Sequence, residues 1–364
     1  MLQPLPYGDA SVRGMDTAAR DRLFQLLSAH GPSGREREAA DLWAAMAGEF
    51  ATVTRDRIGN AIASVGPEDA PAVLLLGHID QIGLIVTHIE EDGVLRVRGL
   101  GGWDPRVLVG QPCSIRTQSG DVPGVIGSVP IHLQKGSERT SGTEMKELWL
   151  DIGAKDGDEA RSVVRVGDDA IVGSGPVQLL GSRVTSRALD DRVGAWAALE
   201  ALRRVAAGNP QVRVVASGCV LEETLGEGAR LVTEAVQPAV SIVIDVTHAA
   251  DVPSIDKGQT GPQKLGAGTV ITRGLGLDET VAAALIDLAE AHGIAYGMEA
   301  MPGGSTHTDV DNTLAAVRSL RAALLGIPLR HMHSPAEVCD LDDLEATAAL
   351  MAAYCLAATP ESLA

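Results

Sequence analysis

The chain has 364 residues, a formal net charge of −18, and only four Trp, three Tyr and two Phe. A single core usually stops growing at about 250–300 residues, so this length predicts at least two domains. The strong negative charge argues against nucleic acid and anionic membranes as partners, because both are bound by basic patches. The scarcity of aromatic side chains also makes platforms for base stacking unlikely. No apolar run approaches the roughly 18 residues of a membrane-spanning helix.

The N-terminus and the cysteines indicate a cytoplasmic protein. Residues 1–14 lack the apolar core of a signal peptide and are interpreted as a short leader. The four cysteines are widely spaced and form no Cys-x-x-Cys pair, which is typical of buried thiols in a reducing compartment. They are Cys113, Cys219, Cys339 and Cys355.

The first 82 residues show helical and strand patterns in turn. Leucines at helical spacing predict a helix over residues 16–30, and a second apolar face predicts another over 35–50. Two short strands, 51–55 and 61–64, flank a turn at Ile58-Gly59-Asn60. A buried strand over 73–76 then leads into Gly77-His78-Ile79-Asp80. In an extended chain His78 and Asp80 face the same way, so Asp80 could orient the ring of His78.

Residues 83–183 have a different texture, which predicts an inserted β-rich domain. Short alternating strands are separated by turns such as Asp92-Gly93 and Ser119-Gly120, and one short acidic helix is expected near 158–163. Residues 134–147, rich in Lys, Ser, Thr and Gly, are interpreted as a mobile loop. His88 and His132 are expected on the surface. The predicted domains are therefore 1–82 and 184–364, which together form the catalytic part, and the insertion 83–183.

The remaining chain alternates strands and helices, which predicts an α/β domain with a mostly parallel central sheet flanked by helices. The expected helices cover residues 195–207, 228–235, 280–292 and 341–355. The expected strands cover residues 212–220, 240–247, 295–298 and 327–333. A polar loop occupies 303–309.

Acids and histidines gather where these elements end or begin. Three predicted strands end in such residues: the first in His78 and Asp80, the second in Glu222 and Glu223, and the third in Asp245. Asp190 precedes a helix, and His331 or His333 ends the last strand. In open α/β sheets ligands bind outside the carboxyl ends of the strands. Two imidazoles with several carboxylates suit zinc or cobalt better than calcium or magnesium, which prefer oxygen ligands alone.

With these residues in view, the chain resembles the tetrahedral aminopeptidases, family forty-two of the metallopeptidases. The resemblance runs from about residue 16 to the C-terminus. Its motifs are Gly77-His78-Ile79-Asp80, Gly101-Gly102-Trp103-Asp104-Pro105, Leu189-Asp190-Asp191-Arg192, Glu222-Glu223, Ile244-Asp245-Val246-Thr247 and His333-Ser334-Pro335.

The resemblance implies a dinuclear metal centre with two Zn²⁺ or Co²⁺ ions per subunit. It implies that Asp190 bridges the metals, that Glu223 and His333 complete one site, and that His78 and Asp245 complete the other. It also implies that Glu222 is the general base, that Asp80 supports His78, and that the Asp190–Asp191 peptide is cis. Among the two late histidines it favours His333 over His331.

The resemblance further implies an aminopeptidase that acts on short peptides, with the insertion forming a PDZ-like or barrel dimerisation domain and dimers building a dodecamer. His248 and His307 match no ligand position, and Gln81 stands where the family usually has Glu. Two enzymatic alternatives are a metal-dependent deacylase or amidohydrolase of the same clan and an endoglucanase, as some relatives are described. Glycoside hydrolysis normally needs two carboxylates and no metal. A non-catalytic alternative is a protein whose metals only stabilise the fold. The preferred N-terminal residue is left open.

Overall fold

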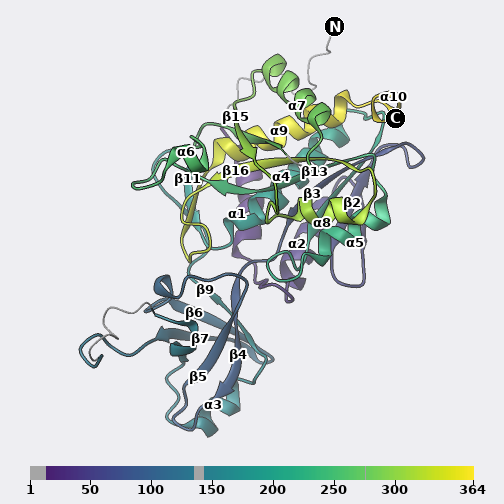
Figure 1. The fold of residues 1–364 in the computed structure, drawn as a ribbon. Helices are drawn as coiled ribbons and strands as arrows, with labels where there is room; N and C mark the ends of the chain where they lie inside the picture. The colour runs from purple at the N-terminus through teal and green to yellow at the C-terminus, as the bar shows by residue number, and fades with distance from the viewer. Residues whose placement is uncertain (1–13, 135–142, 275) are drawn as a thin grey trace.

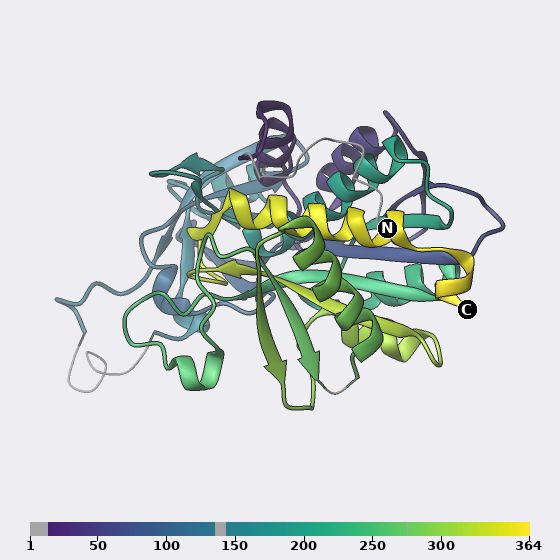
Figure 2. The same cartoon turned by 90° about the horizontal axis from the view of Figure 1, so that it is seen from above.

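The computed structural model describes residues 14–134, 143–274 and 276–364. Residues 1–13 of the expected leader and 135–142 of the expected mobile loop lie outside the described residues. The described chain forms a large α/β part and a barrel that projects from it (Figure 1), and Figure 2 shows the α/β part from above. No helix in the described ranges has the length and apolar character needed to cross a membrane. All four cysteines are buried and unbridged.

The α/β part is built on an eight-stranded sheet, whose four central strands are parallel. These are, in spatial order, β12 (Arg213–Cys219), β3 (Ala72–His78), β13 (Val240–His248) and β16 (Arg321–Leu329). An antiparallel hairpin flanks one side, and a parallel pair that runs antiparallel to β16 flanks the other. The flanking strands are β1 (Thr52–Arg55), β2 (Ala61–Val65), β14 (Thr269–Gly274) and β15 (Tyr296–Met301). The predicted sheet is confirmed.

Helices cover both faces of this sheet because its central strands are apolar on both sides. Val73 and Leu75 of β3 pack into one buried cluster, and Leu74 and Leu76 pack into another. The first cluster includes α1 (Thr17–Ser28), α2 (Arg37–Ala47), α4 (Leu189–Ala207), α7 (Glu279–His292) and α9 (Leu341–Ala357). The second includes α5 (Glu227–Val236) and α8 (Asp309–Ala316). Two one-turn helices, α6 (Lys257–Thr260) and α10 (Pro360–Leu363), lie outside these layers.

A close approach of α4 to β3 sets the position of the site. A Cβ atom at Gly77 would lie 2.4 Å from the backbone of Gly194 and Ala195, so only glycine fits between the strand and the helix. This contact brings the start of α4 against the carboxyl end of β3, which ends at His78.

The barrel is closed by six antiparallel strands with a buried apolar core. In barrel order these are β4 (Gly83–Ile89), β5 (Leu95–Leu100), β8 (Trp149–Asp151), β7 (Gly120–Gly127), β6 (Pro112–Thr117) and β9 (Asp169–Val172). The short helix α3 (Gly157–Val163) and two 3₁₀ turns, Pro105–Val107 and Met145–Glu147, complete it. The sequence did not predict β9, which closes the barrel by pairing with both β4 and β6. The barrel strands run from Gly83 to Val172, and the domain limits at 82 and 183 stay a prediction.

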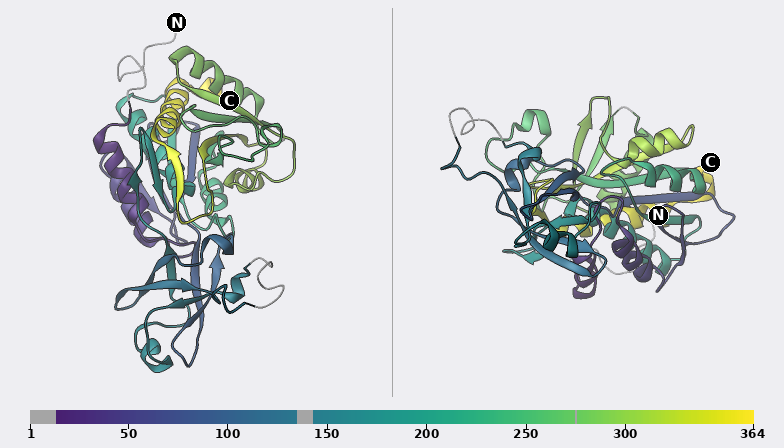
Figure 3. Two further views of the ribbon diagram at one scale, coloured as in Figure 1. Left: turned by 90° about the vertical axis from the view of Figure 1, so that its left-hand side faces the viewer. Right: turned by 90° about the horizontal axis from the view of Figure 1, so that it is seen from below.

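A small third sheet corrects the prediction for the last strand. It contains β10 (Val177–Gln178), β11 (Arg183–Ser186) and β17 (Glu337–Asp340). The predicted strand 327–333 is wrong at both ends, because β16 begins at Arg321 and stops at Leu329, where the chain turns back into β17. His331 and His333 lie in that turn with φ of 60° and 57°, so they share no strand face. Figure 3 shows the α/β part and the barrel from two further sides.

Candidate metal centre

The carboxyl ends of the central strands open into a cavity of about 1380 Å³. Six of the seven predicted site residues line it, and they come from β3, β13, the start of α4, the turn after β12 and the turn after β16. These are His78, Asp190, Glu222, Glu223, Asp245 and His333. The seventh, Asp80, is fully buried beneath them.

Asp190 lies between the two histidines. Its Oδ1 is 3.2 Å from Nε2 of His78, and its Oδ2 is 3.4 Å from Nε2 of His333. Glu223 Oε2 is also 3.4 Å from Nε2 of His333. One carboxylate thus presents a separate oxygen to each side of the cavity. The peptide that joins Asp190 to Asp191 is cis, as the resemblance implied.

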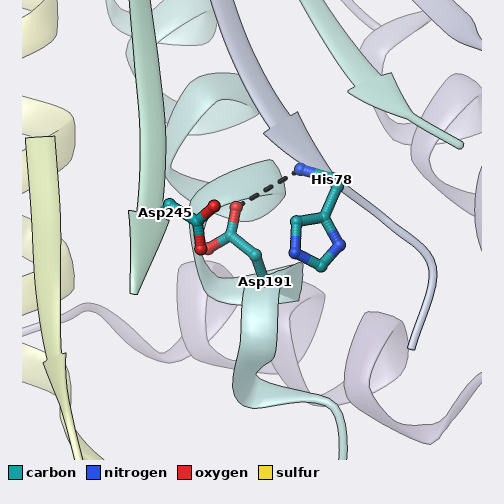
Figure 4. A group of neighbouring side chains, drawn as sticks. All are labelled: His78, Asp191 and Asp245. Carbon is teal, nitrogen blue, oxygen red and sulfur yellow. Dashed lines mark hydrogen bonds between the residues drawn. The ribbon is translucent and has the colours of Figure 1, made fainter. Parts of the chain in front are cut away.

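Two overlapping groups of side chains are compact enough to hold a metal ion. His78, Asp190 and Glu223 form one, and His78, Asp191 and Asp245 form the other, with one ligand atom of each residue within 4.8 Å of the others. Figure 4 shows the second group, in which the carboxylates of Asp191 and Asp245 face each other beside the ring of His78. The sequence did not single out Asp191 as a site residue. The signal that the sequence offered for Asp191 was its position directly after Asp190.

Backbone donors already occupy the carboxylate of Asp191. It accepts hydrogen bonds from the N–H groups of His78 (3.3 Å) and Gly194 (3.0 Å). This side chain therefore ties the end of β3 to the first turn of α4. Asp245, by contrast, accepts only its own neighbour's N–H, from Val246 at 2.7 Å, within the described residues.

Asp80 supports both neighbouring strand ends. Its Oδ1 lies 3.4 Å from Nδ1 of His78, the ring nitrogen turned away from Asp190. Its two oxygens accept the backbone N–H groups of Glu222 and Glu223, each at 3.1 Å. The turn before them is held by Glu36, whose carboxylate accepts the N–H of Leu221 at 3.1 Å.

Burial and mutual repulsion dominate the electrostatics of the acids. Burial raises the pKa of Glu222 to about 7, and burial together with nearby carboxylates raises the pKa of Glu223 and Asp245 well above the usual range. For His78, burial lowers the pKa, but Glu222, Asp190 and Asp80 outweigh it and the net pKa is raised. So many acids around one cavity stay ionised together only when positive charge, such as that of a metal ion, lies among them.

The donor set fits a divalent metal. Glu223 Oε1 is buried and has no hydrogen-bond partner among the described residues, so an oxygen is left for a ligand. Imidazole nitrogens combined with carboxylate oxygens, without thiolates, suit borderline metals such as zinc or cobalt.

The other histidines stay outside this group. His248 and His307 are exposed on the cavity wall, and His331 is exposed outside it. His88 and His132 are exposed on the barrel side, as expected.

Glu337, which the sequence did not single out, is buried beneath the site. Its carboxylate accepts the N–H groups of Asp190 (3.1 Å) and His333 (2.9 Å). It stands four residues after His333, and nothing in the local pattern separates it from an ordinary strand residue.

The barrel also reaches the site, through the loop after β5. A Cβ atom at Gly101 would lie 3.1 Å from Oε2 of Glu223, and one at Gly102 would lie 3.1 Å from Nδ1 of His333. The backbone of Gly102 hydrogen-bonds His333 and raises its pKa, as does Asp190, which has the largest effect. Nε2 of His333 is thereby directed at Asp190 and Glu223.

Comparison with known proteins decides the family. Residues 59–350 match the model of the M42 glutamyl aminopeptidase family. The chain is 33% identical to a lysyl aminopeptidase of Pyrococcus furiosus over 80% of this chain and 83% of that protein. The chain belongs to the M42 aminopeptidase family. It is therefore a peptidase, and the expectation drawn from its motifs is confirmed.

Solved structures of TET peptidases share the fold over most of the chain. A TET aminopeptidase from a marine sediment archaeon, Thaumarchaeota archaeon SCGC AB-539-E09, has a TM-score of 0.90 and 30% identity, covering 95% of this chain and 98% of the other. The TET1 peptidase of Pyrococcus horikoshii has a TM-score of 0.83 and 29% identity, covering 93% and 100%.

Proposed function

We propose that this M42 family member is a dinuclear metallo-aminopeptidase that removes N-terminal residues from short peptides. The observation that carries the proposal is the position of Asp190, with one carboxylate oxygen toward His78 and the other toward His333. A carboxylate placed between two nitrogen ligands in a cavity is the arrangement that a bridging ligand needs.

Two divalent ions, zinc or cobalt, would be held by the predicted residues. Asp190 would be shared, Glu223 and His333 would complete one position, and His78 and Asp245 would complete the other. When bound, such ions lower the pKa of water and polarise the carbonyl oxygen of the substrate.

Glu222 would act as the general base. Its Oε2 lies 3.8 Å from Nε2 of His78, at the edge of the cavity, and burial raises its pKa to about 7. A carboxylate with a pKa close to neutrality can take a proton from water and deliver it to the leaving amine. Asp80 would hold it in place through the N–H of Glu222. A free α-amine of the substrate would be recognised beside these acids.

The alternatives have less support. The family match does not favour a deacylase. An endoglucanase of Thermotoga maritima shares the fold with a TM-score of 0.75, but at 24% identity it is evidence for the fold alone.

We also propose that the chain self-associates, with the barrel region 83–183 forming dimers and dimers forming a dodecamer. The solved Pyrococcus horikoshii relative can assemble into a tetrahedron or a large octahedral shell. Light scattering tests this proposal, and a monomer across the accessible concentration range would remove it.

The experiment that tests the activity is hydrolysis of aminoacyl anilides by metal-stripped protein before and after addition of Co²⁺ or Zn²⁺. Activity that returns with metal and fails on N-acetylated substrates is expected. Hydrolysis of the acetylated substrates instead would favour the deacylase.

A further inference from the structure

The cavity extends from the metal centre to a carboxylate on the edge strand, Glu299 of β15. Its Oε1 accepts a hydrogen bond from the hydroxyl of Thr272, and its Oε2 accepts one from the hydroxyl of Thr247, both at 2.8 Å. Thr272 is the cross-strand partner of Glu299 on β14, whereas Thr247 comes from β13. Two donors from two strands therefore fix the carboxylate before any substrate binds.

Two strands, β16 and β14, lie between Thr247 and Glu299 in the sheet, and a glycine of β16 leaves room beside the Thr247 side chain. A Cβ atom at Gly326 of β16 would lie 2.8 Å from Cγ2 of Thr247 and 3.4 Å from Cβ of Val270. Gly326 pairs with Asp245 on one side and Val270 on the other. Gly326 lines the cavity, and its missing side chain leaves space next to Thr247.

Glu299 is not paired with a basic side chain among the described residues. Within the described residues it forms no ion pair, and the two threonine hydroxyls donate hydrogen bonds but bear no charge. Each of its oxygens accepts one bond and keeps capacity for another. The nearby acids differ, since Glu279 is paired with Arg273 and Asp311 accepts backbone N–H groups of the 305–307 loop.

The position of Glu299 suits the end of a long side chain. Thr247 lies two residues beyond Asp245 on the same strand and the same face, which corresponds to about 7 Å. We consider a substrate residue with its α-amine and scissile carbonyl at the metal centre. An extended lysine or arginine side chain of that residue would reach the region of Thr247 and Glu299. Met301 and Leu324 also line the cavity and offer apolar surface to its aliphatic stem.

We propose that Glu299 receives the cationic side chain of the substrate's N-terminal residue, so that the enzyme prefers N-terminal lysine and arginine. This inference rests on the proposed aminopeptidase function and names its substrate class. Two basic residues, Arg273 and Lys257, also line the cavity. Neither offers a fixed site for an acidic side chain of a substrate, because Arg273 is already paired and Lys257 is exposed on helix α6.

The test compares lysyl, arginyl, norleucyl and glutamyl anilides on the metal-loaded full chain, for the wild type, Glu299→Gln and Glu290→Gln. Norleucine has a straight aliphatic side chain like that of lysine without the amine. Glu290 is an exposed acid of α7 that bonds the hydroxyl of Tyr296 outside the cavity, so it controls for the loss of one charge.

We expect the wild type to have a higher kcat/KM for lysyl than for norleucyl substrate. Glu299→Gln should lower kcat/KM for the lysyl and arginyl substrates roughly tenfold to a hundredfold, the range for losing a hydrogen-bonded charge, and so collapse the lysyl-to-norleucyl ratio. Glu290→Gln should leave that ratio unchanged. An equal loss on all four substrates would overturn the proposal, because it would mean that Glu299 contacts the α-amine or only maintains the fold. A preference for the glutamyl substrate would also overturn it.

A binding measurement separates this inference from the proposed function. Lysinamide and norleucinamide are titrated calorimetrically into the metal-loaded protein, with no turnover required. Suppose that no anilide is hydrolysed, but that lysinamide binds more tightly than norleucinamide and loses this advantage in Glu299→Gln. The proposed aminopeptidase activity would then be wrong, and the proposed cation site would stand. If anilides are hydrolysed without a cationic preference, the activity stands and the cation site is wrong.

Discussion

The backbone N–H of His333 donates a hydrogen bond to Oε1 of Glu337 at 2.9 Å. The other oxygen of the same carboxylate accepts the N–H of Asp190 at 3.1 Å. One buried acid therefore fixes the main chain at two proposed metal ligands that are far apart in the sequence. His333 has a left-handed φ of 57°, which costs free energy unless contacts of this kind hold it.

Glu337→Gln should weaken metal binding without unfolding the protein. The amide keeps one acceptor but places an NH₂ group against the second backbone N–H. Loss of an outer partner of metal ligands typically lowers metal affinity about 10–100-fold. Competition with a chelating dye measures this, with the exposed Glu361→Gln as the matched control. Equal affinities in the two variants would contradict the role.

Glu222→Gln should strongly reduce turnover while the protein keeps its metal. The amide cannot accept the proton of water, so kcat should fall about 10²–10⁴-fold, the usual contribution of a general base. Metal content by elemental analysis should match the wild type. Glu234→Gln, an exposed acid of α5 paired with Arg230, serves as the control. Near-normal activity in Glu222→Gln would exclude this residue as the base.

Asp190→Ala should lose at least one metal ion per subunit, because both histidines would lose the carboxylate between them. Activity should fall with the metal content. Asp92→Ala, at an exposed barrel turn, controls for loss of an aspartate. Full occupancy of two ions in the Asp190 variant would refute the bridging assignment.

Asp343 should make the free energy of unfolding depend on pH. Burial raises its pKa from 3.8 to about 7, although its carboxylate accepts the N–H groups of Gly266 and Gly268. Because the folded-state pKa is the higher one, its contribution to stability is fully present below pH about 4 and is lost as the pH rises through about 7.

The difference between the wild type and Asp343→Asn isolates this effect. Between pH 5 and pH 8 the wild type should lose stability relative to the variant, by a few kcal/mol at most, since one unit of pKa corresponds to about 1.4 kcal/mol. The hydrogen bond that the amide cannot accept adds a penalty that is independent of pH. Urea unfolding of both proteins at several pH values measures the difference, and a constant difference would contradict the shifted pKa.

The sequence predicted those parts of the fold that are set by local patterns. The apolar run of β3 is buried over its whole length, and Asp16 caps α1 through the N–H of Ala19, as its position suggested. Elements fixed by long-range pairing were missed. β9 is short and joins the barrel only by pairing with β4 and β6, and β17 exists because it pairs with β11.

The candidate site shows the same division. The six cavity residues follow from acids and histidines at element ends, together with the family motifs. Asp191, Glu337 and Glu299 were not found, because each acts through main-chain or hydroxyl partners that only the tertiary fold brings near. No local spacing records such contacts.

Gly101 and Gly102 of the barrel lie close to Glu223 and His333, so the barrel supplies part of the wall of the proposed metal centre. The loop that covers Glu223 and His333 leaves and returns through barrel strands. A fragment engineered without the barrel would therefore keep every proposed ligand and still expose one side of the centre to water. Substitutions in this loop would therefore alter the surroundings of Glu223 and His333 without changing either side chain.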